Sequence, residues 1–185
     1  MTDFDDRYYI NQVIGGDTNA FVHLVRRYQK MVYTLVCKIV NDRDDAEDIT
    51  QDIFIKVFES LRSFRKESEF STWLYRIAYN TTINKVRKSK KIFISINEIL
   101  PGVPTEDISP DIDSLSTEEQ LRYLDIVMKK LKPDEAMLIS LFYLDNLSIL
   151  QIADISGLSQ SNVKVKLHRI RKFMNFEINK LIANG

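Results

Sequence analysis

The spacing of apolar residues along the chain predicts helices rather than strands. Between residues 17 and 40, apolar side chains recur every three or four positions, which is the period of one helix face. Segments 44–61 and 71–90 repeat this spacing, and helical patterns resume near residue 116 and continue in three or four segments to residue 181. The positions expected to face inward are Ala20, Phe21, Leu24, Val25, Tyr28, Val32, Leu35, Ala46, Ile49, Ile53, Val57, Leu61, Trp73, Leu74, Ile77, Ala78 and Thr81. The expected fold class is all-α.

One stretch in the middle of the chain interrupts this pattern. Residues 92–120 contain no Lys or Arg. The prolines and carboxylates of this stretch are Pro101, Pro104, Pro110, Glu98, Glu106, Asp107, Asp111, Asp113, Glu118 and Glu119. Because such a composition disfavours regular structure, we expect a flexible acidic linker over residues 92–115. It would join two small helical domains, residues 1–91 and residues 116–185.

Composition narrows the class of protein. The chain has 185 residues, 44% of them hydrophobic, and a formal net charge of zero. Its single cysteine, Cys37, allows no internal disulfide and no cysteine-based metal cluster, so we expect it in the core and expect no metal or cofactor. No apolar run approaches the length of a membrane span, and the acidic start of the chain lacks the apolar segment of a signal peptide. A soluble cytoplasmic protein is therefore expected.

Residues 147–174 have the pattern of a helix-turn-helix. Ala153 is small where two helices would cross, Gly157 suits a turn with positive φ, and Ser159 can cap the second helix. The expected buried stripe is Ile152, Leu158, Val163, Leu167 and Ile170. The residues left outside are Gln160, Ser161, Asn162, Lys164, Lys166, His168, Arg169, Arg171 and Lys172. Such a face is typical of a helix that enters the DNA major groove, although an ordinary helical hairpin with a solvated basic face has the same pattern.

The helix expected over residues 71–90 carries a second polar face. Its members are Arg76, Asn80, Asn84 and Arg87, flanked by Tyr75 and Tyr79. The helix ends in a run of Lys and Arg over residues 85–91. Because amides read base edges, cations neutralise phosphates and aromatic rings stack on unpaired bases, this face suits nucleic acid. The alternative is a solvated face with a basic tail.

The helix expected over residues 44–61 suggests a protein-docking surface. The residues on its mixed polar and apolar face are Asp48, Gln51, Asp52 and Ile55. Phe54 and Phe58 lie beside this face, and with Ile55 they form either a second core contact or an exposed partner-binding surface. Some of the acidic residues need no functional explanation, because carboxylates near a helix N-terminus are favourable.

Three blocks together resemble the extracytoplasmic-function (ECF) group of bacterial RNA polymerase sigma factors. They are DAEDITQDIFIKVF at residues 45–58, FSTWLYRIAYN at residues 70–80, and the helix-turn-helix pattern. Their order and spacing match the group over residues 15–174. The resemblance implies sigma region 2 in the first domain, which binds core RNA polymerase and recognises and melts the promoter −10 element. It implies sigma region 4 in the second domain, which recognises the −35 element, and an anti-sigma factor as a further partner.

The resemblance also implies a role for each candidate residue. The residues implied in core polymerase binding are Asp48, Gln51, Asp52, Phe54, Ile55 and Phe58. Those implied in binding single-stranded −10 DNA are Phe64, Phe70, Thr72, Trp73, Tyr75, Arg76, Tyr79, Asn80, Asn84, Arg87 and Lys88. Those implied in binding the −35 duplex are Gln160, Ser161, Asn162, Lys164, His168, Arg169, Arg171 and Lys172. Phe64 and Phe70 are either stacking surfaces for bases or anchors that hold their loop on the core.

Two other classes of function compete with this interpretation. A self-sufficient helix-turn-helix regulator would need a ligand pocket or a dimer interface in residues 1–91, which the basic run fits poorly. A nucleic-acid enzyme would need clustered carboxylates for metal ions, or a base positioned beside a nucleophile. His23 and His168 belong to different expected domains. We therefore expect a promoter-specificity subunit rather than an enzyme.

Overall fold

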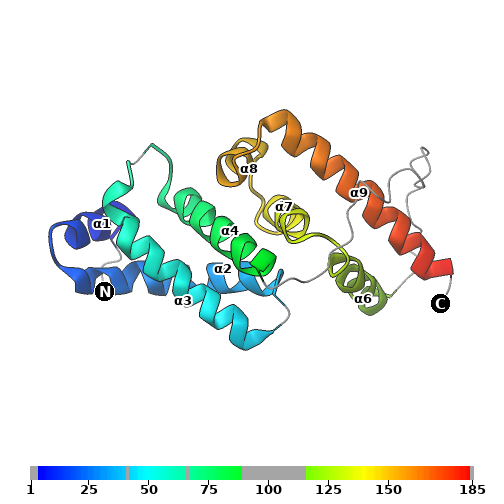
Figure 1. The fold of residues 1–185 in the computed structure, drawn as a ribbon, viewed down its shortest axis with the longest axis horizontal. Coiled ribbons are helices and arrows are strands. Elements are labelled where there is room, and N and C mark those ends of the chain that lie inside the picture. The colour runs from blue at the N-terminus through cyan, green and yellow to red at the C-terminus, as the bar shows by residue number, and fades with distance from the viewer. Residues whose placement is uncertain (1–3, 41, 66, 89–115, 184–185) are drawn as a thin grey trace. The chain divides into compact units, whose positions relative to one another are not determined.

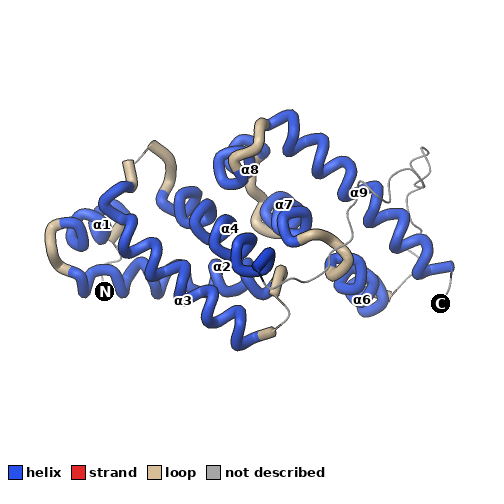
Figure 2. The backbone as a smooth tube through the Cα atoms, viewed as in Figure 1, coloured by secondary structure: helices blue, strands red, loops and turns tan. Residues whose placement is uncertain are grey.

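The computed structural model describes residues 4–40, 42–65, 67–88 and 116–183. Within these ranges every regular element is a helix, which confirms the all-α fold class (Figure 2). The expected acidic linker, residues 92–115, lies outside them. Helices α1 to α4 belong to one compact unit, and α6, α7, the first part of α8, and α9 belong to a second (Figure 1).

Three long helices build the first unit. They are α2 (Phe21–Cys37), α3 (Arg43–Ser60) and α4 (Phe70–Lys88). α3 packs against both α2 and α4, and α2 also contacts α4. The largest fully buried side chains of this unit are Ile10, Leu24, Leu35, Ile53, Leu61 and Leu74. The predicted inward stripes are confirmed except at five half-buried positions, Phe21, Val25, Tyr28, Trp73 and Ile77.

The sequence pattern does not predict the short helix α1, Asp6–Ile14. Tertiary contacts hold it in place, because Asp6 pairs with Arg27 of α2 at 2.5 Å and accepts a hydrogen bond from the hydroxyl of Tyr28. Burial and this carboxylate raise the pKa of Tyr28. The buried residues of α1 are only Tyr9, Ile10 and Val13. A stripe this short does not stand out from the polar residues around it.

Several helix starts differ from the sequence expectation. The helix expected over residues 17–40 begins as a 3₁₀ turn, Thr18–Ala20, and Asp17 caps that turn instead of α2. Asp42 caps α3 by accepting hydrogen bonds from two backbone N–H groups of its first turn. A second 3₁₀ turn, Leu61–Ser63, follows α3.

Three residues of the first unit have surroundings that differ from the prediction. α4 begins at Phe70, one residue before the helix expected from the sequence, so Ser71 and Thr72 lie inside its first turn. Cys37, which was expected in the core, is half-buried at the end of α2.

The second unit contains α6 (Thr117–Met128), α7 (Pro133–Tyr143), α8 (Ile149–Ser156) and α9 (Gln160–Ala183). Ser116 closes a capping box at the start of α6. α9 packs on both α6 and α7, and its 24 residues make it longer than the short segments that the sequence predicts. The largest fully buried side chains here are Leu131, Met137, Leu138, Leu141, Ile152 and Phe173.

α8, the turn after it and α9 form the helix-turn-helix expected from the sequence. Gly157 has a φ of 72°, in the left-handed region that glycine enters at little cost. Ser159 caps α9, because its Oγ accepts a hydrogen bond from the backbone N–H of Asn162 at 3.2 Å. The predicted stripe is buried at Ile152, Val163, Leu167 and Ile170 and half-buried at Leu158.

The described residues hold neither a membrane-spanning helix nor a cluster of metal ligands. None of the described helices combines the length and the hydropathy that a membrane crossing requires. No three His, Cys, Asp or Glu side chains of the described ranges gather as the ligands of a metal ion would.

Candidate nucleic-acid interface

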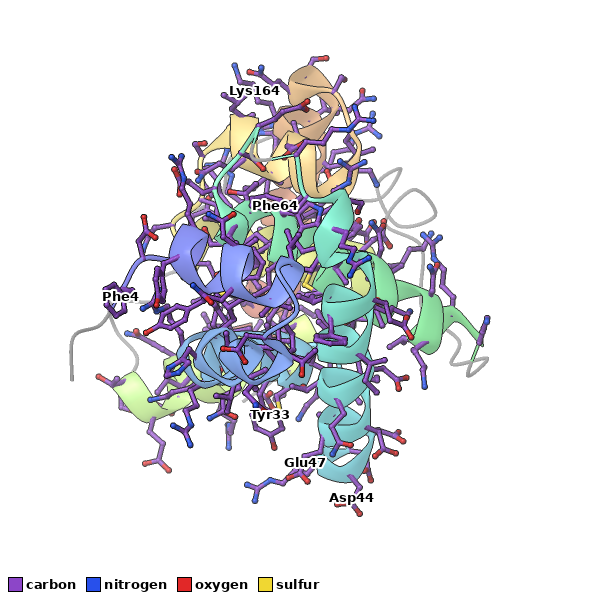
Figure 3. The ribbon with its side chains drawn as sticks, turned by 90° about the vertical axis from the view of Figure 1, so that its left-hand side faces the viewer. Phe4, Tyr33, Asp44, Glu47, Phe64 and Lys164 are labelled. Carbon is purple, nitrogen blue, oxygen red and sulfur yellow. The ribbon has the colours of Figure 1, made fainter. Side chains whose placement is uncertain are left out.

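α9 presents a polar and basic face opposite its buried stripe. The exposed residues of this face are Gln160, Ser161, Asn162, Lys164, His168, Arg169 and Arg171. Lys164 projects away from the helix in Figure 3. Lys166 and Lys172 are half-buried, and the ammonium of Lys166 lies 3.6 Å from the carboxylate of Asp134 in α7. The outward face is therefore where the sequence places it, with these two lysines less accessible.

The cations of this face meet no carboxylate from their own helix. The acidic residue of α9 is Glu177, which is buried and forms an ion pair with Lys130. Because the net charge of the whole chain is zero, the positive face is a local property of α9. Cations and amides gathered without carboxylates favour contact with a phosphate backbone.

α4 carries the second predicted face. Its exposed polar residues are Arg76, Asn80, Asn84, Arg87 and Lys88. The first four follow one another at spacings of four, four and three residues, so they share one side of the helix. Trp73, one turn before them, is half-buried. Two amides and three cations are thus available on α4 for a ligand that combines bases with phosphates.

The two aromatic residues of the loop before α4 are core anchors. Phe64 is 8% exposed and Phe70 is 3% exposed. Their ring centroids lie 5.7 Å apart, Phe64 lies 5.2 Å from Trp73, and Phe70 lies 5.5 Å from Tyr28 of α2. The cluster encloses both rings, which supports the anchor alternative over stacking on bases.

Three further residues expected at −10 DNA are also buried. They are Thr72, Tyr75 and Tyr79. The physical reason is that α4 packs against both α2 and α3, so its buried arc is wider than one apolar stripe. Tyr75 and Tyr79, which flank the polar face in the sequence, therefore lie inside the unit, and their burial disfavours stacking on bases.

α3 presents the mixed face that the sequence singled out. Asp48 and Gln51 are exposed, Ile55 is 55% exposed and Phe58 is 40% exposed. The acidic start of the same helix, with Asp44 and Glu47, can be followed in Figure 3. Two large apolar side chains beside two polar ones, all on one helix face, suit a protein partner.

Phe54 does not belong to this exposed face. It is buried, with its ring centroid 6.5 Å from that of Phe21. Phe58 also meets Phe21, at 5.1 Å, but keeps much of its surface accessible. The sequence left two alternatives for these side chains. Phe54 makes a second core contact, whereas Ile55 and Phe58 form an exposed surface.

An ion pair that the sequence does not predict joins α3 to α4. The carboxylate of Asp52 lies 2.7 Å from the ammonium of Lys85. Its hydrogen bond and charge raise the pKa of Lys85. Asp52 belongs to the expected docking face and Lys85 to the basic end of α4, so this contact links the two surfaces. A contact between residues so far apart in sequence leaves no periodic signal.

Comparison with known proteins identifies the two units. Residues 24–92 match the family Sigma-70 region 2, and residues 121–174 match the family Sigma-70, region 4. The first match spans α2, α3 and α4, and the second spans most of α6, all of α7 and α8, and the first part of α9. The fold and the sequence together therefore define a sigma subunit of bacterial RNA polymerase.

Two characterised relatives narrow the class. The ECF RNA polymerase sigma factor SigW of Bacillus subtilis is 31% identical, over 93% of this chain and 96% of the relative. The ECF RNA polymerase sigma-E factor of Escherichia coli is 33% identical, over 96% of both chains. The chain belongs to the ECF group of RNA polymerase sigma factors, and it acts in promoter-specific initiation of transcription.

Solved structures share this fold. The structure of CnrH in complex with the cytosolic domain of CnrY covers 97% of both chains, with a TM-score of 0.66 and 21% identity. The sigma factor RpoE in complex with the anti-sigma factor NepR from Bartonella quintana covers 85% of this chain and 96% of its own, with a TM-score of 0.62 and 20% identity. These identities are low, so the likeness supports the all-α architecture alone.

Proposed function

We propose that residues 116–185 act as the −35 reader, residues 1–91 act as the core-binding and −10 domain, and residues 92–115 tether them. The observation that carries this proposal is the exposure, on one side of each helix, of the polar residues of α9 and of α4. The exposed side chains form one face on each helix, and both faces have the chemistry of nucleic-acid contacts.

α9 is the proposed −35 helix. Recognition helices of the helix-turn-helix class contact base edges through their N-terminal residues. Gln160, Ser161 and Lys164 therefore read bases, with Asn162 and His168 beside them. Arg169, Arg171 and Lys172 contact phosphates, which fixes the register of the helix on the duplex without reading sequence.

α4 is the proposed −10 helix. Asn80 and Asn84 bind base edges of the unpaired non-template strand, and Arg76, Arg87 and Lys88 follow its backbone. Half-buried Trp73 is the aromatic residue of α4 that keeps surface for stacking. Captured bases can return about 1–3 kcal/mol each by stacking, against roughly 1.4 kcal/mol for each melted step, so opening needs no ATP.

α3 is the proposed docking helix for core RNA polymerase. Asp48, Gln51, Ile55 and Phe58 supply its exposed contacts, and Asp52 lies at its edge beside Lys85. Fixed on the polymerase, two modest DNA-binding units act together at a set spacing, so their affinities multiply. The polymerase supplies the catalysis, and we propose no enzymatic activity for this chain.

An anti-sigma factor is a further proposed partner. The two structural neighbours described above were solved in complexes, one of them with a named anti-sigma factor. Because a sigma factor acts where the chromosome is transcribed, we also propose a cytoplasmic location.

The test of the two DNA assignments is run-off transcription with core polymerase on a promoter library randomised at −35 and −10. Gln160→Ala should change the enriched −35 sequence and leave the −10 sequence as it was. Asn84→Ala should do the reverse. If either substitution changed the element assigned to the other helix, the assignment would be wrong.

The docking assignment has its own test. Asp48→Arg combined with Gln51→Arg should reduce co-purification with core polymerase and leave the fold intact, because both positions are exposed. Glu118→Arg, at an exposed position of α6, is a charge-reversal control on the other domain. Equal recovery of core polymerase with the double variant and with the control would contradict the role of α3.

A further inference from the structure

One large apolar residue of α9 is exposed among its polar neighbours. Val165 is 47% exposed, and among the described residues it is the large apolar side chain of α9 that faces solvent to this extent. Single exposed apolar residues are common on protein surfaces, so this exposure alone does not indicate a binding site. The position of Val165 on the helix does indicate one.

Val165 lies at the centre of the outward face of α9. It follows Val163 and precedes Leu167 by two positions each, and both of those residues are buried. A step of two residues turns a helix by more than half a turn, so Val165 lies on the side opposite the buried stripe. Exposed Ser161 lies one turn before it and exposed His168 one turn after it.

This position is also within the part of α9 that reaches base edges. α9 begins at Gln160, so Val165 belongs to the second turn of the helix. Its isopropyl group is only partly covered within the unit, so apolar surface remains for a ligand to bury. The side chain is stiff, since branching at Cβ restricts χ1, and it therefore loses little freedom when a ligand contacts it.

We propose that Val165 contacts the 5-methyl group of a thymine in the −35 duplex and so selects thymine at one base pair. The methyl group is the apolar feature that thymine presents in the major groove, and apolar side chains recognise it there. The polar neighbours of Val165 read donors and acceptors, which the methyl group lacks. The inference rests on the proposed −35 role of α9 and names one base that this helix selects.

The test removes the methyl group and nothing else. Holoenzyme assembled from the full chain and core polymerase is titrated with the duplex promoter enriched from the library, in which each −35 thymine is replaced singly by deoxyuridine. At one position the replacement should weaken binding by wild-type holoenzyme about fourfold, the effect expected for one buried carbon group. Val165→Ala should weaken binding to the thymine duplex by a similar factor and should bind thymine and deoxyuridine duplexes equally.

Leu121→Ala is the matched control. Leu121 is 62% exposed on α6, and this variant should keep the wild-type response to deoxyuridine. Thermal unfolding of Val165→Ala should match wild type, because the residue is exposed. The inference is overturned if the enriched −35 element contains no thymine, if no deoxyuridine replacement weakens binding, or if wild type and Val165→Ala respond equally. A library with no −35 preference at all would contradict the proposed function of α9 itself, and this inference with it.

Discussion

α4 and α9 carry similar side chains but are enclosed to different extents. Both have exposed amides and cations on one side. Of the 19 residues of α4, ten are buried, whereas seven of the 24 residues of α9 are buried. α4 packs against α2 and α3 and begins at the aromatic cluster of the loop before it, whereas α9, which packs on α6 and α7, keeps a larger share of its residues exposed or half-buried.

This difference changes what each helix can offer to DNA. On α9, the residues that can contact DNA are those that helix periodicity places on the outer side. On α4, the buried aromatic residues hold the helix in position, and the exposed amides and cations remain for the ligand. An aromatic residue next to a polar face is therefore not by itself a sign of base stacking.

The largest expected effect is on the free energy of unfolding, which should distinguish the buried aromatic residues at the start of α4 from its exposed polar face. Phe70→Ala should destabilise the first unit by about 3–5 kcal/mol, because it leaves a cavity where a fully enclosed ring was. Asn80→Ala, at an exposed position, should stay within about 0.5 kcal/mol of wild type. Urea unfolding followed by the fluorescence of Trp73, the single tryptophan, measures both. Wild-type stability in Phe70→Ala together with loss of −10 binding would reverse the anchor assignment.

The next effect concerns promoter opening by the exposed face of α4. Asn80→Ala should leave closed-complex formation nearly intact and weaken the open complex by about 1–3 kcal/mol, the value of one base-edge contact. Permanganate-reactive thymines near −10 report the open complex. A pre-melted template should partly rescue transcription, because its melting cost is already met. Asn19→Ala, an exposed amide of the same unit, is the control, and an equally severe defect on both templates would point to folding or docking instead.

A smaller effect is expected on α9. Arg171→Ala should weaken binding to all −35 sequences about equally and should reduce the salt slope of log K by roughly one unit, because it removes one phosphate contact. Titration at several salt concentrations measures this slope. Gln160→Ala should instead change base preference and keep the slope. If Arg171→Ala changed the base preference, Arg171 would be assigned to a base edge instead of a phosphate.

The smallest effect concerns the ion pair between α3 and α4. Asp52→Asn removes the partner of Lys85, so binding to a pre-melted −10 template should strengthen slightly at low salt and return to wild type at high salt. The measurement uses saturating core polymerase, so that any docking defect does not enter. Asp48→Asn removes the same charge without breaking the pair. Identical behaviour of the two variants would show that the net charge matters and the pair does not.

Helices with a clear apolar periodicity could be predicted from the sequence. Features that depend on a single tertiary contact could not. The stripe of α9 and its cap at Ser159 follow from local rules that act within one or two turns. The short helix α1 depends on Asp6 and Arg27, which meet only after α2 has folded beside it. The pair of Asp52 and Lys85 is invisible in the sequence for the same reason.

By itself, the sequence determined the all-α class, the helix-turn-helix with its positive-φ glycine, the exposed polar faces of α4 and α9, and membership of the ECF group. Periodicity and caps are properties of each segment, and the order of the motifs can be read directly along the chain. Only the tertiary structure decided that Phe54, Phe64, Phe70, Tyr75 and Tyr79 lie in the core. The reason is that burial depends on how closely neighbouring segments enclose a helix, and this is set by packing between segments distant in the chain.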